Sequence, residues 1–167
     1  MKTSRPSRYC SRVVAISRVA AIAAAGLWLA GCSDEPDVEM QAGEAEYLQY
    51  CATCHTRDGA GRPPTFPPLA GSEWLELGPE AVALVVLLGL RGEIEVAGKT
   101  YRGYMPTMRH IDDAELAALL GFIGNQWGQW DRTPDAGQIA ALRELVAGEE
   151  LIEGRAALER LLEGIER

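Results

Sequence analysis

The chain has 167 residues, of which 47% are hydrophobic and 24% charged, values that are ordinary for one globular domain. Five of its 16 basic residues and none of its 24 acidic residues lie in the first 31 positions, so the remainder carries a formal charge of −13. This excess of negative charge excludes a nucleic-acid-binding surface and adhesion of side chains to anionic lipid.

Residues 1–31 have the composition of a bacterial export signal. A basic start is followed by an apolar run, Val19 to Ala30, that is shorter than the ~20 residues needed to span a bilayer. The run ends in LAGC (29–32), which resembles the lipobox of bacterial lipoproteins and implies acylation of Cys32. The alternative is an ordinary signal with a chance cysteine. Residues 32–41 are polar and acidic, and we expect a tether there.

The stretch CATCHTRDG (51–59) contains Cys51, Cys54 and His55 in the pattern Cys-x-x-Cys-His, the attachment signature of a c-type haem. In such a site the two thiols add to the vinyl groups of the porphyrin, and the histidine supplies the proximal imidazole. A redox-active dithiol is the rival interpretation, but it does not account for the adjacent histidine. We therefore predict one covalently attached haem c, with His55 as an iron ligand.

With this motif, residues 42–131 resemble a class I c-type cytochrome, one of the small monohaem electron carriers. The resemblance includes Gly43 and Tyr47, eight and four residues before the first cysteine, and the segment PPLAG (67–71). In that family the glycine allows a C-terminal helix to cross closely, and the Pro67 carbonyl would accept the ring N–H of the proximal histidine. The resemblance implies an all-α fold of four or five helices around one haem.

The resemblance also implies that Met105, which precedes Pro106 shortly before the last family helix, is the sixth iron ligand. His110, Met108 and an open site are the alternatives, whereas Met40 lies in the tether. Ligation by both His55 and Met105 would leave no place at the iron for a small-molecule substrate.

Three further elements are expected before residue 131. Gly78 and Pro79 begin a buried helix that contains AVALVVLLGL (81–90). Alternation over 92–104 predicts a hairpin with Gly98 in its turn. The segment IDDAEL (111–116) predicts a helix with Asp112 as N-cap and an apolar stripe from Leu116 to Trp127, where Phe122 or Ile123 would meet the Gly43/Tyr47 helix. Trp127 is alternatively a residue at the haem edge.

The hairpin contains side chains that either hydrogen-bond the haem propionates or are simply solvated: Arg91, Lys99, Tyr101, Arg102 and Tyr104.

Residues 132–167 form a predicted helical extension that either wraps the cytochrome core or docks on another subunit. They contain no catalytic constellation. We expect an electron-transfer protein, not an enzyme, that is lipid-anchored on the periplasmic side of the inner or outer membrane. Its expected partners are redox proteins in or at that membrane. The alternative is the electron-accepting cytochrome subunit of a periplasmic dehydrogenase or reductase complex.

Overall fold

In the computed structural model, which describes residues 40–165, helix α1 (Glu44–Tyr50) leads directly into the short helix α2 (Ala52–His55). The Cys-x-x-Cys-His motif therefore lies on a nearly continuous helical path. The predicted leader, Cys32 and most of the tether lie outside the described residues.

Helix α1 crosses helix α4 (Asp113–Ile123) at Gly43 and Tyr47, as the family pattern predicts. Gly43 has a φ of 84°, and a Cβ atom there would overlap the carbonyl of Ala118. Tyr47 is fully buried, and its ring lies 5.2 Å from that of Phe122. The close crossing thus depends on a missing side chain at one position and on an aromatic contact at the next turn.

Helix α4 begins at the predicted capping box, in which Asp112 accepts from the backbone N–H of Glu115 and the Glu115 side chain accepts from that of Asp112. Its apolar stripe is buried, but the α-helix ends at Ile123 and continues as a π-helical turn, Gly124–Gly128 (labelled η2). Trp127 lies in this turn and packs on Tyr47 and Phe122.

The apolar segment after Gly78 forms helix α3 (Pro79–Leu88), with proline at its first position and most side chains buried. A 3-10 turn, Leu75–Leu77 (labelled η1), precedes it. Strands β1 (Leu90–Val96) and β2 (Lys99–Met105) then form the expected antiparallel hairpin, in which Val96 pairs with Lys99 around the Ala97–Gly98 turn.

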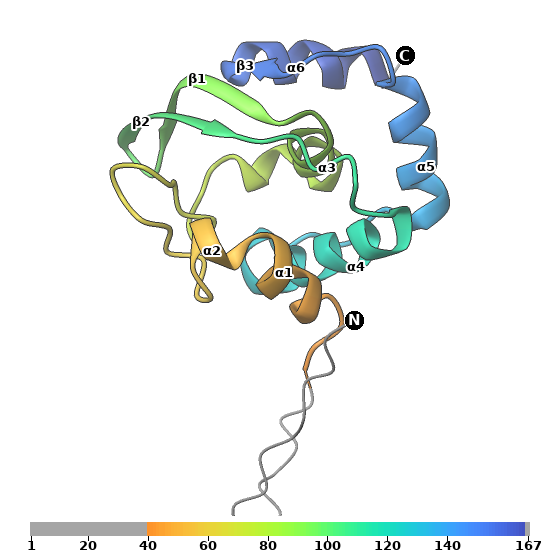
Figure 1. Ribbon diagram of the computed structural model, residues 1–167, viewed down its shortest axis with the longest axis horizontal. Coiled ribbons are helices and arrows are strands. Elements are labelled where there is room, and N and C mark those ends of the chain that lie inside the picture. The colour runs from red at the N-terminus through yellow and green to blue at the C-terminus, as the bar shows by residue number, and fades with distance from the viewer. Residues whose placement is uncertain (1–39, 166–167) are drawn as a thin grey trace, which may run out of the picture. The chain divides into compact units, whose positions relative to one another are not determined.

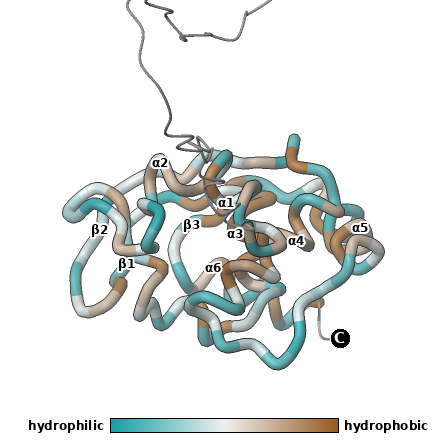
Figure 2. Tube along the Cα trace, turned by 90° about the horizontal axis from the view of Figure 1, so that it is seen from below, coloured by the Kyte–Doolittle hydropathy of each residue, from teal (hydrophilic) through white to brown (hydrophobic). Residues whose placement is uncertain are grey.

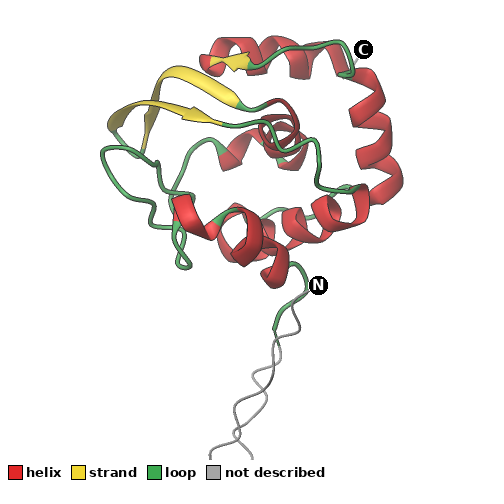
Figure 3. Ribbon diagram, viewed as in Figure 1, coloured by secondary structure: helices red, strands yellow, loops and turns green. Residues whose placement is uncertain are grey.

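The expectation of a hairpin alone is wrong, because a third strand, β3 (Ile152–Glu153), pairs in parallel with β1. The sheet order is β2-β1-β3 (Figure 3). Strand β3 has only two residues, which is too short for an alternation of apolar and polar side chains to be recognised in the sequence. The pairing of β3 with β1 therefore could not be predicted from a local pattern.

The C-terminal extension contains helices α5 (Ala136–Leu145) and α6 (Gly154–Ile165) and wraps the rest of the described chain. Helix α5 packs on α4, and α6 packs on α3 and β1 (Figure 1). Helix α5 includes hydrophobic positions, which are brown along the trace (Figure 2). Apolar residues of both helices, among them Ile139 and Leu158, are buried in the core. Within residues 40–165, no helix has the length and apolar character that crossing a bilayer requires.

We predict that Gly43→Ala lowers the free energy of unfolding by about 2–4 kcal/mol, because the new Cβ meets the α4 backbone and the residue must keep a positive φ. Chemical denaturation of the purified protein measures this change. Gly121→Ala is the control, since Gly121 lies inside α4 with open space around its Cβ position and should gain up to about 1 kcal/mol. Equal stability of the two variants would contradict the proposed role of the crossing.

Candidate functional site

His55 is the last residue of α2, and its ring is fixed by the loop that follows. The Nδ1 atom lies 2.9 Å from the carbonyl oxygen of Pro67. Because a carbonyl only accepts, Nδ1 carries the proton and Nε2 of the neutral ring keeps a free lone pair. Burial lowers the pKa of His55, and the bond to Pro67 only partly offsets this effect. The ring is therefore a neutral imidazole ready to ligate a metal.

Pro67 reaches His55 because the loop between them is tightly folded. The backbone N–H of Gly61 donates to the His55 carbonyl at 2.9 Å, and those of Leu69 and Ala70 both donate to the Gly59 carbonyl. Gly61 has a φ of 68°, and a Cβ atom there would meet the carbonyl of Pro67. A glycine at this position thus allows the loop to bring the proline carbonyl under the ring.

Cys51 and Cys54 are both free thiols, with Cys51 buried and Cys54 half-buried. Burial raises the pKa of the Cys51 thiol to about 12, and the neighbouring Cys54 acts in the same direction. A redox-active dithiol requires an accessible thiol with a lowered pKa. The surroundings of Cys51 therefore disfavour the dithiol interpretation.

Two adjoining cavities lie against this motif. The helix-side cavity has an empty volume of about 680 Å³ and is lined by the turn before α3, by α3 itself and by parts of α4, β1 and α6. The hairpin-side cavity, of about 710 Å³, is lined by β1, β2, the loop before Pro67 and the segment after Met105. Six residues line both cavities: Cys51, His55, Pro67, Leu90, Ile94 and Met105.

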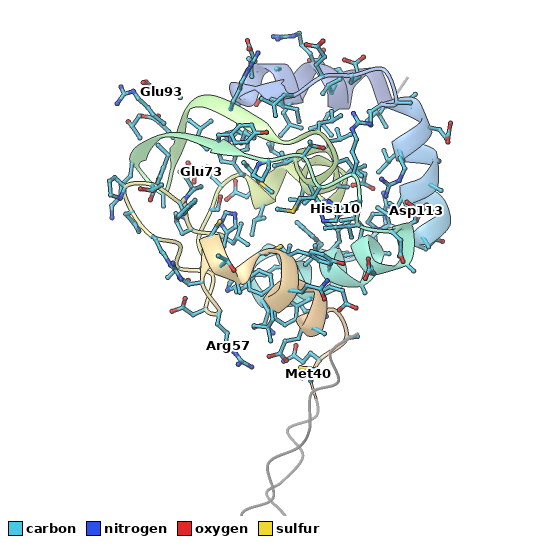
Figure 4. All side chains as sticks on the ribbon, in the orientation of Figure 1. Met40, Arg57, Glu73, Glu93, His110 and Asp113 are labelled. Carbon is cyan, nitrogen blue, oxygen red and sulfur yellow. The ribbon has the colours of Figure 1, made fainter. Side chains whose placement is uncertain are left out.

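Met105 lines both cavities with His55, Met108 shares only the hairpin-side cavity with it, and His110 and Met40 line neither. Met105 is the last residue of β2. Met108 lines the hairpin-side cavity but not the helix-side cavity. His110 is exposed, is absent from the lining of both cavities and lies edge-on to the ring of Tyr50, 5.8 Å away (Figure 4). Met40 is 54% exposed. Of these four, only Met105 shares both cavities with the histidine.

Of the five hairpin candidates for a polar contact with a cofactor, Tyr101 alone is buried. Its hydroxyl is the one buried side-chain polar atom among residues 40–165 that has no hydrogen-bond partner, and the residue lines the hairpin-side cavity. Arg91 and Arg102 are instead exposed and form ion pairs with Glu153 and Glu93.

Several lining residues were not anticipated from the sequence, among them Trp74, Leu158 and Tyr50. Trp74 lies beside the helix-side cavity and donates its indole N–H to the Glu95 carbonyl at 2.9 Å, which joins the loop before α3 to β1. Leu158 of α6 also lines this cavity, and Tyr50 lines the other. Trp127, by contrast, is absent from both linings and packs on Tyr47 and Phe122.

These groups fit a covalently attached haem. Two thiols, a neutral imidazole and a thioether face an apolar space, and histidine with methionine is an established ligand pair for haem iron. The Tyr101 hydroxyl has no hydrogen-bond partner of its own and suits the polar propionates of a haem. Residues 40–165 contain no cluster of three or more His, Cys, Asp or Glu side chains that could hold a metal ion directly.

Comparison with known proteins gives the same result. The family model described as cytochrome c oxidase, cbb3-type, subunit III matches residues 38–123. Cytochrome c-552 of Thermus thermophilus is 46% identical over 92 residues, which cover 53% of this chain and 70% of the relative. A second cytochrome c-552, from a particular strain of the same organism, is equally similar, with 62% of its length covered. The cytochrome c subunit of an alcohol dehydrogenase (quinone) from Gluconobacter oxydans is 36% identical over 90 residues, which cover 52% of this chain and 18% of the relative.

Proposed function

The chain belongs to the c-type cytochromes, in the family whose model is described as cytochrome c oxidase, cbb3-type, subunit III, and we propose that it is a membrane-tethered carrier of single electrons on the periplasmic side of a bacterial membrane. As a monohaem c-type cytochrome it contains one covalently bound haem c. The bound haem supplies the redox chemistry, a one-electron change between Fe(III) and Fe(II).

In this proposal Cys51 and Cys54 form the two thioether bonds, and His55 is the proximal ligand. The Pro67 carbonyl fixes the His55 ring through Nδ1 at 2.9 Å and makes the imidazole a better donor. A fixed ring keeps the same ligand geometry in both oxidation states. The protein therefore contributes little rearrangement when an electron passes.

One observation carries the assignment of a carrier over that of a haem enzyme: Met105 and His55 line both cavities. If both side chains held the haem iron, the thioether and the imidazole would leave no open position for a substrate. The thioether would also favour the ferrous state and raise the reduction potential relative to a second imidazole. This ligand pair is the one that the resemblance to class I cytochromes implies.

We predict that Met105→Ala lowers the reduction potential, abolishes the weak methionine–iron band in the near red, and lets carbon monoxide bind the reduced protein. Spectroscopy and a redox titration measure all three effects. Met108→Ala is the matched control and should keep the band, because Met108 lines only one cavity. An unchanged band in the Met105→Ala variant would show that Met105 is not an iron ligand.

Tyr101 would donate its otherwise unpaired hydroxyl to a haem propionate. A buried hydroxyl without a partner costs about 1–3 kcal/mol. The hydrogen bond to the propionate would remove this cost and so stabilise the folded protein with haem bound. A donor to the charged carboxylate also lowers the pKa of that propionate.

We predict that Tyr101→Phe raises the pKa of this propionate, because the ionised form loses its donor. The pH-dependent step in the reduction potential should then move to higher pH, and above that step the potential should fall. Voltammetry as a function of pH measures both effects. Thr100→Val, which removes a hydroxyl from an exposed residue of the same strand that lines neither cavity, should leave the profile unaltered. Matching profiles for the two variants would argue against the propionate contact.

The location of the carrier is proposed from the lipobox resemblance at Cys32. An acylated cysteine would leave about ten residues before α1, which could span at most ~35 Å when fully extended. Such a tether raises the effective concentration of partners in the same membrane without any new contact.

We predict that Cys32→Ser releases a haem protein with an unchanged potential from the membrane fraction and slows electron transfer to membrane partners. Fractionation and oxidation kinetics with membranes measure this. Equal transfer rates from the released and anchored forms would defeat the tether proposal.

The second candidate function is that of the cytochrome subunit of a periplasmic dehydrogenase or reductase. The similarity to a dehydrogenase's cytochrome c subunit favours it, at 36% identity over 90 residues. Stable co-purification with a catalytic subunit would support this alternative over a free carrier.

A further inference from the structure

The segment that follows Met105, residues 106–112 (the ligand loop), connects β2 to α4 and is anchored on α3. The Thr107 hydroxyl donates to the Leu87 carbonyl at 2.7 Å, and the Met108 backbone N–H donates to the Val86 carbonyl at 2.9 Å. These two bonds hold one side of the loop against α3.

The other side of the ligand loop is held by Arg143 of α5. Its guanidinium donates from Nη1 to the Arg109 carbonyl and from Nη2 to the Ile111 carbonyl, both at 2.8 Å. Its Nε donates to Asp113, in the first turn of α4, at 2.9 Å. The side chain is only 25% exposed. One side chain thus satisfies two carbonyls of the loop and ties the loop to the helix that follows it.

A second arginine makes the converse connection. Arg109 of the ligand loop donates to the Val146 carbonyl at 3.3 Å and to the Glu149 carbonyl at 2.9 Å, both just after α5. The ligand loop and α5 with the residues after it therefore each contribute one arginine that donates to backbone carbonyls of the other. Asp113 lies beside α5 in Figure 4.

Helix α5 lies beyond residues 38–123, which the family model matches, so this support comes from the extension of this chain. We infer that Arg143 is a positioning residue for the sixth iron ligand: it holds the ligand loop closed so that Met105 stays at the iron and exogenous ligands are excluded. The inference rests on the proposed role of Met105. A guanidinium is required because its planar fork donates in several fixed directions, which an ammonium cannot do.

The test is the binding of imidazole to the oxidised holoprotein, since imidazole must displace Met105 and therefore measures how easily the loop releases it. We expect Arg143→Gln to raise the affinity for imidazole about tenfold or more, the change expected when one hydrogen bond to a charged group is lost. The methionine–iron band should also become weaker. Arg143→Lys should give an intermediate affinity.

Two control variants separate positioning from general stability. Asp113→Asn removes the ion-pair partner but leaves both carbonyl bonds of Arg143, so the imidazole affinity should change by less than about threefold. Asp135→Ala removes the N-cap of α5 and keeps Arg143, which should lower stability by about 0.5–2 kcal/mol. The imidazole affinity of this variant should stay near that of the parent protein. Thermal unfolding and haem content are measured for every variant.

A folded Arg143→Gln protein with unchanged imidazole affinity would overturn the inference, as would an equal rise in Asp135→Ala. If Arg143→Gln does not fold, Arg109→Gln removes the second set of bonds between the ligand loop and the end of α5 and should also raise the affinity. The Met105→Ala variant separates the two levels of failure. An unchanged methionine–iron band in Met105→Ala refutes the ligand assignment itself. A lost band in Met105→Ala together with an unchanged imidazole affinity in Arg143→Gln refutes only the positioning role.

Discussion

The contact between His55 Nδ1 and the Pro67 carbonyl constrains the rest of the site, because an imidazole can hold iron only through a nitrogen without a proton. Fixing the proton on Nδ1 makes Nε2 the ligand atom and sets the plane of the ring. The tight turn at Gly61 then follows as a requirement for bringing Pro67 to that atom. The apolar cavities also keep the ring able to ligate a metal, since burial lowers the pKa of His55 and so favours its neutral form.

Local patterns predicted the elements that surround this contact. The Cys-x-x-Cys-His motif, the capping box at Asp112 and the alternation before Met105 each have a signal within a few residues. The motif spacing relative to Gly43 predicted the helix crossing, because the family pattern gives both partners. Such features depend on sequence neighbours or on a known long-range pair, and for this reason they could be read before the structure.

Most of the features that were missed join distant parts of the chain. Strand β3 pairs with β1 across about 60 residues, and Leu158 lines a cavity whose other walls come from residues 51–123. The bonds of Arg143 to two backbone carbonyls leave no trace in side-chain periodicity, because a carbonyl acceptor is present at every residue. The π-helical turn at the end of α4 could not be predicted either, since its residues also suit an ordinary α-helix. Sequence reasoning thus proposed the iron ligands but not the framework that would hold one of them.

That framework has a consequence for an electron carrier. A thioether is a weak, neutral ligand, so if Met105 ligates the iron as we propose, the loop that presents it supplies part of the free energy that keeps it there. In this chain the loop is held on one side by two bonds to α3 and on the other by the arginines shared with α5. Bonds to backbone carbonyls do not depend on the redox state of a nearby group, and they restrain the loop equally before and after electron transfer. A loop restrained in this way favours the same ligand set in both oxidation states, and that favours fast transfer over chemistry at the metal.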